Sequence, residues 1–202
     1  MKSKATQGAR AGFLLAGGKS SRMGTNKAFL DFGRHTLLER ALGVLKEACS
    51  VVTIVGDPAI FARFGPAVAD VFPDCGPLGG IHAALLGSSV EFNFILAVDL
   101  PFVSAELVKF LLGAAEDSRA IVTIPRTRAG LQPLCAVYRR EFASAAEQAL
   151  GAGNYKVDAA FANVRRRVIE ERELVAAGFS ESNFLNINTP QDLGESARRL
   201  KL

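Results

Sequence analysis

The sequence predicts a three-layer α/β fold, with a mostly parallel sheet and helices on both of its faces. Two observations support this class. Apolar runs alternate with segments whose apolar residues recur at helical spacing along the 202 residues. The apolar runs are also continuous rather than alternating with polar residues, as expected for strands that helices cover on both faces.

The strands of this sheet are predicted from short apolar runs between turn residues, and the most hydrophobic of them is 92–98. The predicted strands are 12–15, 51–55, 67–71, 92–98, 120–125, 134–138 and the edge strand 164–169. The arginines of the edge strand are expected to face water.

The helices are predicted from their spacing and their caps. Thr36 begins the first one, because Glu39 follows it at the spacing of a capping box. Ser104 caps another, and Thr189 followed by Pro190 predicts the start of a C-terminal helix. The helix that Ser104 caps is predicted over 105–115, and the other predicted helices are 60–64, 81–86, 141–150 and 173–176.

The chain is expected to form one domain over residues 11–202, after a disordered N-terminal tail at 1–10, because it contains no repeat and no linker. Its net charge of +4 is scattered, without a basic face studded with aromatic residues, so nucleic-acid binding is not expected. No segment approaches the ~20 apolar residues of a membrane span, and no signal peptide is recognisable. An anionic small molecule is the more economical partner.

The three cysteines, Cys49, Cys75 and Cys135, lie far apart and form neither a disulfide framework nor a pair of metal ligands. Unpaired cysteines are what a reducing cytoplasm permits, so a cytoplasmic protein is expected.

A glycine-rich loop at residues 16–27 follows the first strand. Gly17 and Gly18 allow the backbone N–H groups to approach a ligand closely, and Lys19, Arg22 and Lys27 supply cations for a polyphosphate. The loop is not a P-loop, because that pattern needs glycine at position 13, where the chain has phenylalanine. A plain strand-to-helix turn with solvated cations remains the alternative.

Asp99 follows the most hydrophobic strand and precedes Leu100-Pro101. A carboxylate at the end of a buried strand suits Mg²⁺, which binds one or two carboxylates together with phosphate oxygens. The ends of parallel strands meet at one edge of the sheet, so Asp99 and the glycine loop are expected at the same site. An Asx-turn is the alternative for Asp99. His35 and His82 lack zinc-ligand spacing, and His82 is interpreted as a structural histidine with satisfied nitrogens.

Asp70 and Asp74 flank the end of a short strand, near a second loop rich in glycine and proline. One of them is a candidate for binding a base or a ribose, while turn formation is the alternative, especially for Asp74, which follows a proline.

Together, these motifs resemble a known family, the molybdenum cofactor guanylyltransferases, which are nucleotidyltransferases with a Rossmann-like fold. The resemblance covers about residues 10–195. Its motifs are Leu15-Ala16-Gly17-Gly18 with Ser20-Ser21-Arg22-Met23-Gly24 and Lys27, then Gly76-Pro77-Leu78-Gly79-Gly80-Ile81, then Asp99-Leu100-Pro101, then Asn186-Ile187-Asn188-Thr189-Pro190.

The resemblance implies transfer of GMP from GTP to the terminal phosphate of the molybdopterin cofactor, with release of pyrophosphate and with Mg²⁺ as cofactor. It assigns catalysis to Arg22, Lys27 and Asp99, and makes Asp99 the Mg²⁺ ligand. The backbone of residues 15–17 would hold the guanine and the ribose. The residues implied on the nucleotide side are Leu15, Ala16, Gly17, Gly18, Lys19, Lys27, Asp70 and Asp99.

The resemblance also implies a pterin side. Asn186 and Asn188 would lie near the pterin substrate or the metal, and Gln132 belongs to a stretch on the pterin side. The implied partners are GTP and molybdopterin, together with molybdopterin-handling proteins and acceptor molybdoenzymes.

Three alternatives remain at the level of sequence. A molybdopterin cytidylyltransferase would use CTP, although Ala16-Gly17-Gly18 favours GTP over the Ala-Ala-Gly typical of that group. A sugar-1-phosphate or methylerythritol nucleotidyltransferase would carry a proline–lysine pair that Thr25-Asn26-Lys27-Ala28 lacks. A non-catalytic nucleotide-binding adaptor would not need the carboxylate of Asp99.

Overall fold

The computed structural model describes residues 9–17 and 26–187. In this part of the chain, eight strands form one sheet, in the order β10-β7-β9-β6-β1-β4-β5 with β8 paired to β7. The strands of the sheet are β1 (Arg10–Leu15), β4 (Val51–Val55), β5 (Ala67–Val68), β6 (Phe92–Ala97), β7 (Val122–Thr127), β8 (Gly130–Leu131), β9 (Cys135–Arg139) and β10 (Arg166–Ile169).

The central strand β1 pairs in parallel with β4 on one side and with β6 on the other. Strand β9 runs antiparallel to both β6 and β7, whereas β10 is parallel to β7. The predicted mostly parallel sheet is therefore confirmed, with β9 reversed inside it. After β1, the chain first adds β4 and β5 on one side of this strand and then adds β6 on its other side. This change of side leaves a crevice at the carboxyl ends of β1, β4 and β6.

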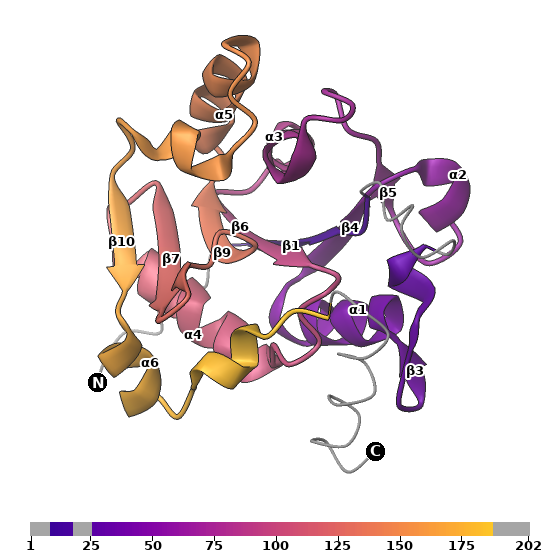
Figure 1. The fold of residues 1–202 in the computed structure, drawn as a ribbon, viewed down its shortest axis with the longest axis horizontal. Helices are drawn as coiled ribbons and strands as arrows, with labels where there is room; N and C mark the ends of the chain where they lie inside the picture. The colour runs from indigo at the N-terminus through magenta and orange to yellow at the C-terminus, as the bar shows by residue number, and fades with distance from the viewer. Residues whose placement is uncertain (1–8, 18–25, 188–202) are drawn as a thin grey trace.

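Helices cover both faces of this sheet, as predicted. Figure 1 shows α3 and α5 over one face and α1 and α4 over the other. The helices are α1 (Leu37–Ala48), α2 (Pro58–Phe61), α3 (Gly76–Leu86), α4 (Ala105–Glu116), α5 (Phe142–Gly151) and α6 (Glu171–Ala176). Shorter elements are the 3₁₀ turns η2 (Lys27–Phe29), η3 (Val157–Phe161) and η4 (Glu181–Phe184), and the two-stranded ribbon β2 (Asp31–Phe32) with β3 (His35–Thr36).

Two hydrophobic cores lie on the two faces of the sheet. Leu14 of β1 and Leu96 of β6 belong to the core under α1 and α4, whereas Phe13 and Ile95 belong to the core under α3 and α5. Neighbouring residues of one strand thus enter different cores, because successive side chains of a strand point to opposite faces. This arrangement explains why the strands are continuous apolar runs.

The predicted helix starts at Thr36 and Ser104 are confirmed. The Thr36 hydroxyl accepts a hydrogen bond from the Glu39 N–H at 3.2 Å, and the Glu39 carboxylate accepts one from the Thr36 N–H at 2.8 Å, which completes the capping box. The Ser104 hydroxyl accepts from the Leu107 N–H at 3.3 Å. These bonds satisfy N–H groups that the first turn of a helix leaves without partners.

Helix α3 begins at Gly76, earlier than the predicted start at Ile81. Pro77 occupies the first turn of the helix, where a missing N–H costs nothing. The helix continues through the glycines of this turn. Because these residues have no side chain, the helix can approach its neighbours closely. A Cβ atom on Gly79 would lie 2.9 Å from the Phe72 carbonyl oxygen, and one on Gly80 would lie 3.2 Å from Leu15.

Some predictions concern residues outside the described ranges. They are the N-terminal tail over residues 1–8, the loop residues Gly18, Lys19 and Arg22, the residue Asn188, and the helix start at Thr189–Pro190. Among the described residues, no helix combines the length and apolar character that crossing a membrane would require.

Candidate active site

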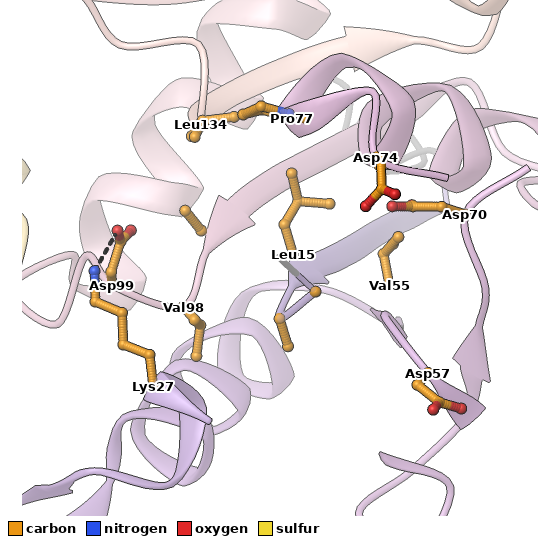
Figure 2. Close-up of a pocket in the computed structure, with 15 residues that line it drawn as sticks. Leu15, Lys27, Val55, Asp57, Asp70, Asp74, Pro77, Val98, Asp99 and Leu134 are labelled. Carbon is orange, nitrogen blue, oxygen red and sulfur yellow. Dashed lines mark hydrogen bonds and ion pairs between the residues drawn. The ribbon is translucent and has the colours of Figure 1, made fainter. Parts of the chain in front are cut away.

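A cavity of about 890 Å³ lies at the carboxyl ends of β1, β4 and β6. Figure 2 shows its two ends, with Lys27 and Asp99 at one, Asp70 and Asp74 at the other, and Leu15 between them. The cavity is lined by Leu15, Ala16, Gly17, Lys27, Val55, Asp57, Asp70, Asp74, Gly76, Pro77, Gly80, Ala97, Val98, Asp99 and Leu134.

Lys27 and Asp99 form an ion pair at the first end of the cavity. The Lys27 Nζ lies 2.9 Å from the Asp99 Oδ2, and the two side chains are only 13% and 21% exposed. The Asn26 side chain caps the turn η2 by accepting the Ala28 N–H at 3.1 Å, and the burial of Ala28 anchors this turn. The polypeptide thus brings a cation and a carboxylate from distant parts of the chain to one point.

The Asp99 carboxylate is only half satisfied. Its Oδ1 atom is buried and accepts no hydrogen bond in the described structure. A buried carboxylate oxygen without a partner carries a desolvation cost that a cation would offset. Asp99 therefore fits the hard-cation ligand that its position after β6 predicts. Among the described residues, no group of three or more histidine, cysteine or acidic side chains could hold a metal by itself.

The end of β1 forms the floor of the cavity, but two of its N–H groups are already used. Both the Ala16 and the Gly17 N–H donate to the Val55 carbonyl, at 3.0 and 3.1 Å, and the Leu15 carbonyl accepts the Val98 N–H at 3.1 Å. The expectation that Gly17 offers its N–H to a ligand is therefore wrong.

The second end of the cavity is acidic. The carboxylates of Asp70 and Asp74 lie near each other in Figure 2. The Asp70 Oδ1 is buried without a hydrogen-bond partner in the described structure, and burial raises the pKa of this carboxyl. Asp74 has a φ of 61°, so it forms the turn that was its alternative reading while also lining the cavity.

One lining carboxylate was not recognised in the sequence. Asp57 follows β4 as Asp99 follows β6, so the same reasoning about strand ends would have found it. Its Oδ1 atom accepts the Ala59 N–H at 2.9 Å and thereby caps α2. Figure 2 shows Asp57 apart from the other acidic side chains.

The two described residues predicted on the pterin side, Gln132 and Asn186, lie on different segments of the chain. The Gln132 amide donates to the Thr127 hydroxyl at 3.0 Å and to the Gly130 carbonyl at 3.3 Å, so it braces the β7–β8 hairpin and is not among the lining residues. Asn186 is exposed, but the next residue, Ile187, donates its N–H to the Asp99 carbonyl at 2.9 Å. The segment that carries Asn186 therefore lies beside the Asp99 end of the cavity.

His82 is buried on α3, at 1% exposure, and packs edge-on against the Phe72 ring. Neither of its ring nitrogens has a hydrogen-bond partner in the described structure. The expectation of satisfied nitrogens is therefore wrong, although the structural placement in the core is right. Burial lowers the pKa of His82, while the charge of Glu147 opposes that shift.

The three-layer fold and a cavity at the strand ends, holding an ammonium–carboxylate pair, define an α/β nucleotidyltransferase. The model of the MobA-like NTP transferase domain matches residues 12–171, and the chain belongs to this family.

Relatives and a solved structure agree with this assignment. The chain is 40% identical to a probable molybdenum cofactor guanylyltransferase of Pelotomaculum thermopropionicum, over 90% of this chain and 89% of the relative. It is 35% identical to the molybdenum cofactor guanylyltransferase of Desulfosudis oleivorans, over 94% and 95%. The resemblance found in the sequence motifs is thereby confirmed.

The fold is similar to that of the molybdopterin-guanine dinucleotide biosynthesis protein A of Archaeoglobus fulgidus, with a TM-score of 0.83 and 24% identity. The match covers 95% of this chain and 98% of that one.

Proposed function

We propose that this protein transfers the GMP group of GTP to the terminal phosphate of the molybdopterin form of the molybdenum cofactor and releases pyrophosphate. The observation that carries the proposal is the partly buried Lys27–Asp99 pair at the carboxyl end of β6, facing a cavity of about 890 Å³. The names of the relatives with 35–40% identity support the same reaction.

The reaction needs no nucleophile from the protein. A phosphate oxygen of the acceptor attacks the α-phosphorus of GTP in line, a new P–O bond forms, and the bond to the β-phosphate breaks with its electron pair leaving on pyrophosphate. The protein contributes positions and charges. The Lys27 ammonium is placed to stabilise negative charge on the transferring and leaving phosphates.

Asp99 is the proposed ligand of Mg²⁺, because its Oδ1 atom is buried without a hydrogen-bond partner in the described structure and Mg²⁺ prefers carboxylate oxygens. When bound, the ion would neutralise charge on the triphosphate. Leu15, Val98 and Leu134 line the same cavity and would exclude water from the reacting phosphates.

The opposite end of the cavity supports guanine as the base. Guanine presents N–H donors at N1 and at its exocyclic N2 along one edge, whereas cytosine has a single donor group, its exocyclic amine. The Asp70 carboxylate at this end is an acceptor, and acceptors pair with a donor-rich edge. We place the base there and the triphosphate toward Lys27.

The test is pyrophosphate release from the purified protein, measured with GTP or CTP, in the presence and absence of molybdopterin. We expect release only with GTP and molybdopterin together. Release with CTP instead would identify a cytidylyltransferase, and nucleotide binding without any release would identify an adaptor. An Asp99→Asn variant distinguishes turnover at this site from a contaminating activity.

A further inference from the structure

The Lys27 ammonium occupies the carboxylate that is proposed to bind a divalent cation. Asp99 is the carboxylate proposed to bind a divalent cation, yet its Oδ2 atom already holds an ammonium at 2.9 Å. Both side chains are largely buried, so water screens the two charges poorly. A second cation at this carboxylate would be repelled by the first.

The Lys27–Asp99 ion pair differs from an ordinary surface ion pair. Lys109 and Glu47 form a surface ion pair at 2.8 Å, with side chains that are 44% and 61% exposed. Neither residue lines the cavity. Both members of the Lys27–Asp99 pair instead line the cavity, and the Asp99 Oδ1 atom is buried without a hydrogen-bond partner among the described residues. A buried pair is costly unless its remaining oxygens are satisfied.

A nucleoside triphosphate changes this balance, because phosphate oxygens accept hydrogen bonds from lysine readily. With a phosphate nearby, the ammonium has an alternative partner and the Asp99 carboxylate becomes available to a metal ion. The two cations then no longer compete for one carboxylate.

We infer that Lys27 keeps divalent cations from binding Asp99 until a nucleoside triphosphate draws its ammonium away, so that metal and nucleotide bind with positive coupling. The inference rests on the proposed function for the identity of the nucleotide, but the competition at Asp99 requires only the ion pair. By linkage, the nucleotide raises the affinity for the metal by the same factor as the metal raises that for the nucleotide.

The test measures binding of Mn²⁺ alone, from the electron paramagnetic resonance signal of free Mn²⁺, without nucleotide or acceptor. Lys27→Met removes the charge and keeps the length of the side chain, and we expect it to bind Mn²⁺ about tenfold tighter than wild type. Lys27→Arg keeps the charge and should bind as weakly as wild type. Lys109→Met, which removes a lysine from the surface pair, should also match wild type.

Two further measurements complete the experiment. Lys27→Met combined with Asp99→Asn should lose the gained binding, because the gain requires the Asp99 carboxylate. A non-hydrolysable GTP analogue should raise the Mn²⁺ affinity of wild type by a larger factor than that of Lys27→Met.

A folded Lys27→Met protein that binds Mn²⁺ no tighter than wild type would overturn the inference. Folding is checked by thermal unfolding, and Lys27→Gln repeats the comparison if Lys27→Met melts early. The arm with Mn²⁺ alone contains no nucleotide, so it is decided independently of whether GTP is the substrate. Failure of the proposed function would appear instead as absent pyrophosphate release from wild type.

Discussion

The two ends of the cavity hold carboxylates in opposite electrostatic states. At one end, the Asp99 carboxylate is paired with the Lys27 ammonium at 2.9 Å. At the other, Asp70 lies near a second carboxylate, Asp74, and burial raises the pKa of Asp70. Asp99 and Asp70 each also have a buried Oδ1 atom without a hydrogen-bond partner in the described structure.

This contrast indicates which part of a nucleotide each end can accept. A phosphate group is attracted by the Lys27 ammonium. A hydrogen-bond donor gains most from an acceptor that burial has deprived of water. In the proposed binding mode, the base of the nucleotide would therefore lie toward Asp70 and its phosphates toward Lys27.

The largest predicted effect is at the paired end. Asp99→Asn removes the charge of the proposed metal ligand while nearly preserving its shape, and we expect turnover to fall about 10³-fold or more. The rate of pyrophosphate release measures the loss, and an unchanged circular dichroism spectrum shows that the fold is intact. A variant with near-normal turnover would remove Asp99 from the mechanism.

A smaller loss is expected for the other member of the pair. Lys27→Ala should cost about 2–4 kcal/mol of transition-state stabilisation, as for other preorganised charge-stabilising groups. The measurement is kcat/KM for GTP at saturating molybdopterin, with Lys109→Ala as the control for removing a lysine from an ion pair. A loss below about tenfold would make Lys27 a peripheral lysine and break the proposed contrast.

The acidic end should affect binding rather than chemistry. Asp70→Asn is expected to raise the KM for GTP about tenfold with kcat little changed, because a hydrogen bond to a charged acceptor is worth about 1.5–3 kcal/mol. Asp31→Asn, an exposed carboxylate on β2, is the matched control. A fall in kcat at unchanged KM would instead place Asp70 at the reacting phosphates.

The same substitution should change stability with pH. Because the pKa of Asp70 is raised in the folded protein, the folded state holds this proton more tightly than the unfolded state. Wild type therefore loses stability as the pH rises from the ordinary aspartate pKa through the raised pKa of Asp70, and Asp70→Asn does not. We expect the variant to have the higher Tm at neutral pH, with the difference vanishing below the ordinary aspartate pKa of about 4.

The smallest effect is expected at His82, behind the acidic end. Its pKa is lowered in the folded protein, so the unfolded state binds the proton more tightly, and stability should fall as the pH drops below about 6.5. When the pH is lowered from 8 to 5, the melting temperature of His82→Leu should fall less than that of wild type. His35→Gln, at an exposed position on β3, is the matched control for replacing a histidine.

Much of the fold was predictable because local patterns determine it. The apolar runs at 51–55 and 92–98 became β4 and β6, and the cap residues Thr36 and Ser104 began the helices they predicted. The early start of α3 was missed because the glycines around Pro77 are typical of a loop. Their role in close packing depends on Leu15 and Phe72, which lie elsewhere in the sequence.

The site was partly predictable for the same reason. Lys27, Asp70 and Asp99 all line one cavity, as the rule of strand ends and the family resemblance implied. Their catalytic and binding roles remain predictions. Local sequence could not reveal that the Val55 carbonyl occupies the N–H groups of Ala16 and Gly17, because that bond depends on how β1 and β4 pair. The unpartnered nitrogens of His82 also arise only from tertiary packing.

The central position of β1 has a consequence for synthesis of the chain. Its partner on one side, β4, follows α1, but its partner on the other side, β6, is added only after α2, β5 and α3. During translation, β1 can pair with β4 well before the ribosome delivers β6. One hydrogen-bonding edge of β1, an interior strand that carries Phe13 and Leu14, is then exposed, and such an edge is prone to pair with other chains. The nascent protein is therefore most vulnerable to aggregation in the interval before residues 92–97 emerge.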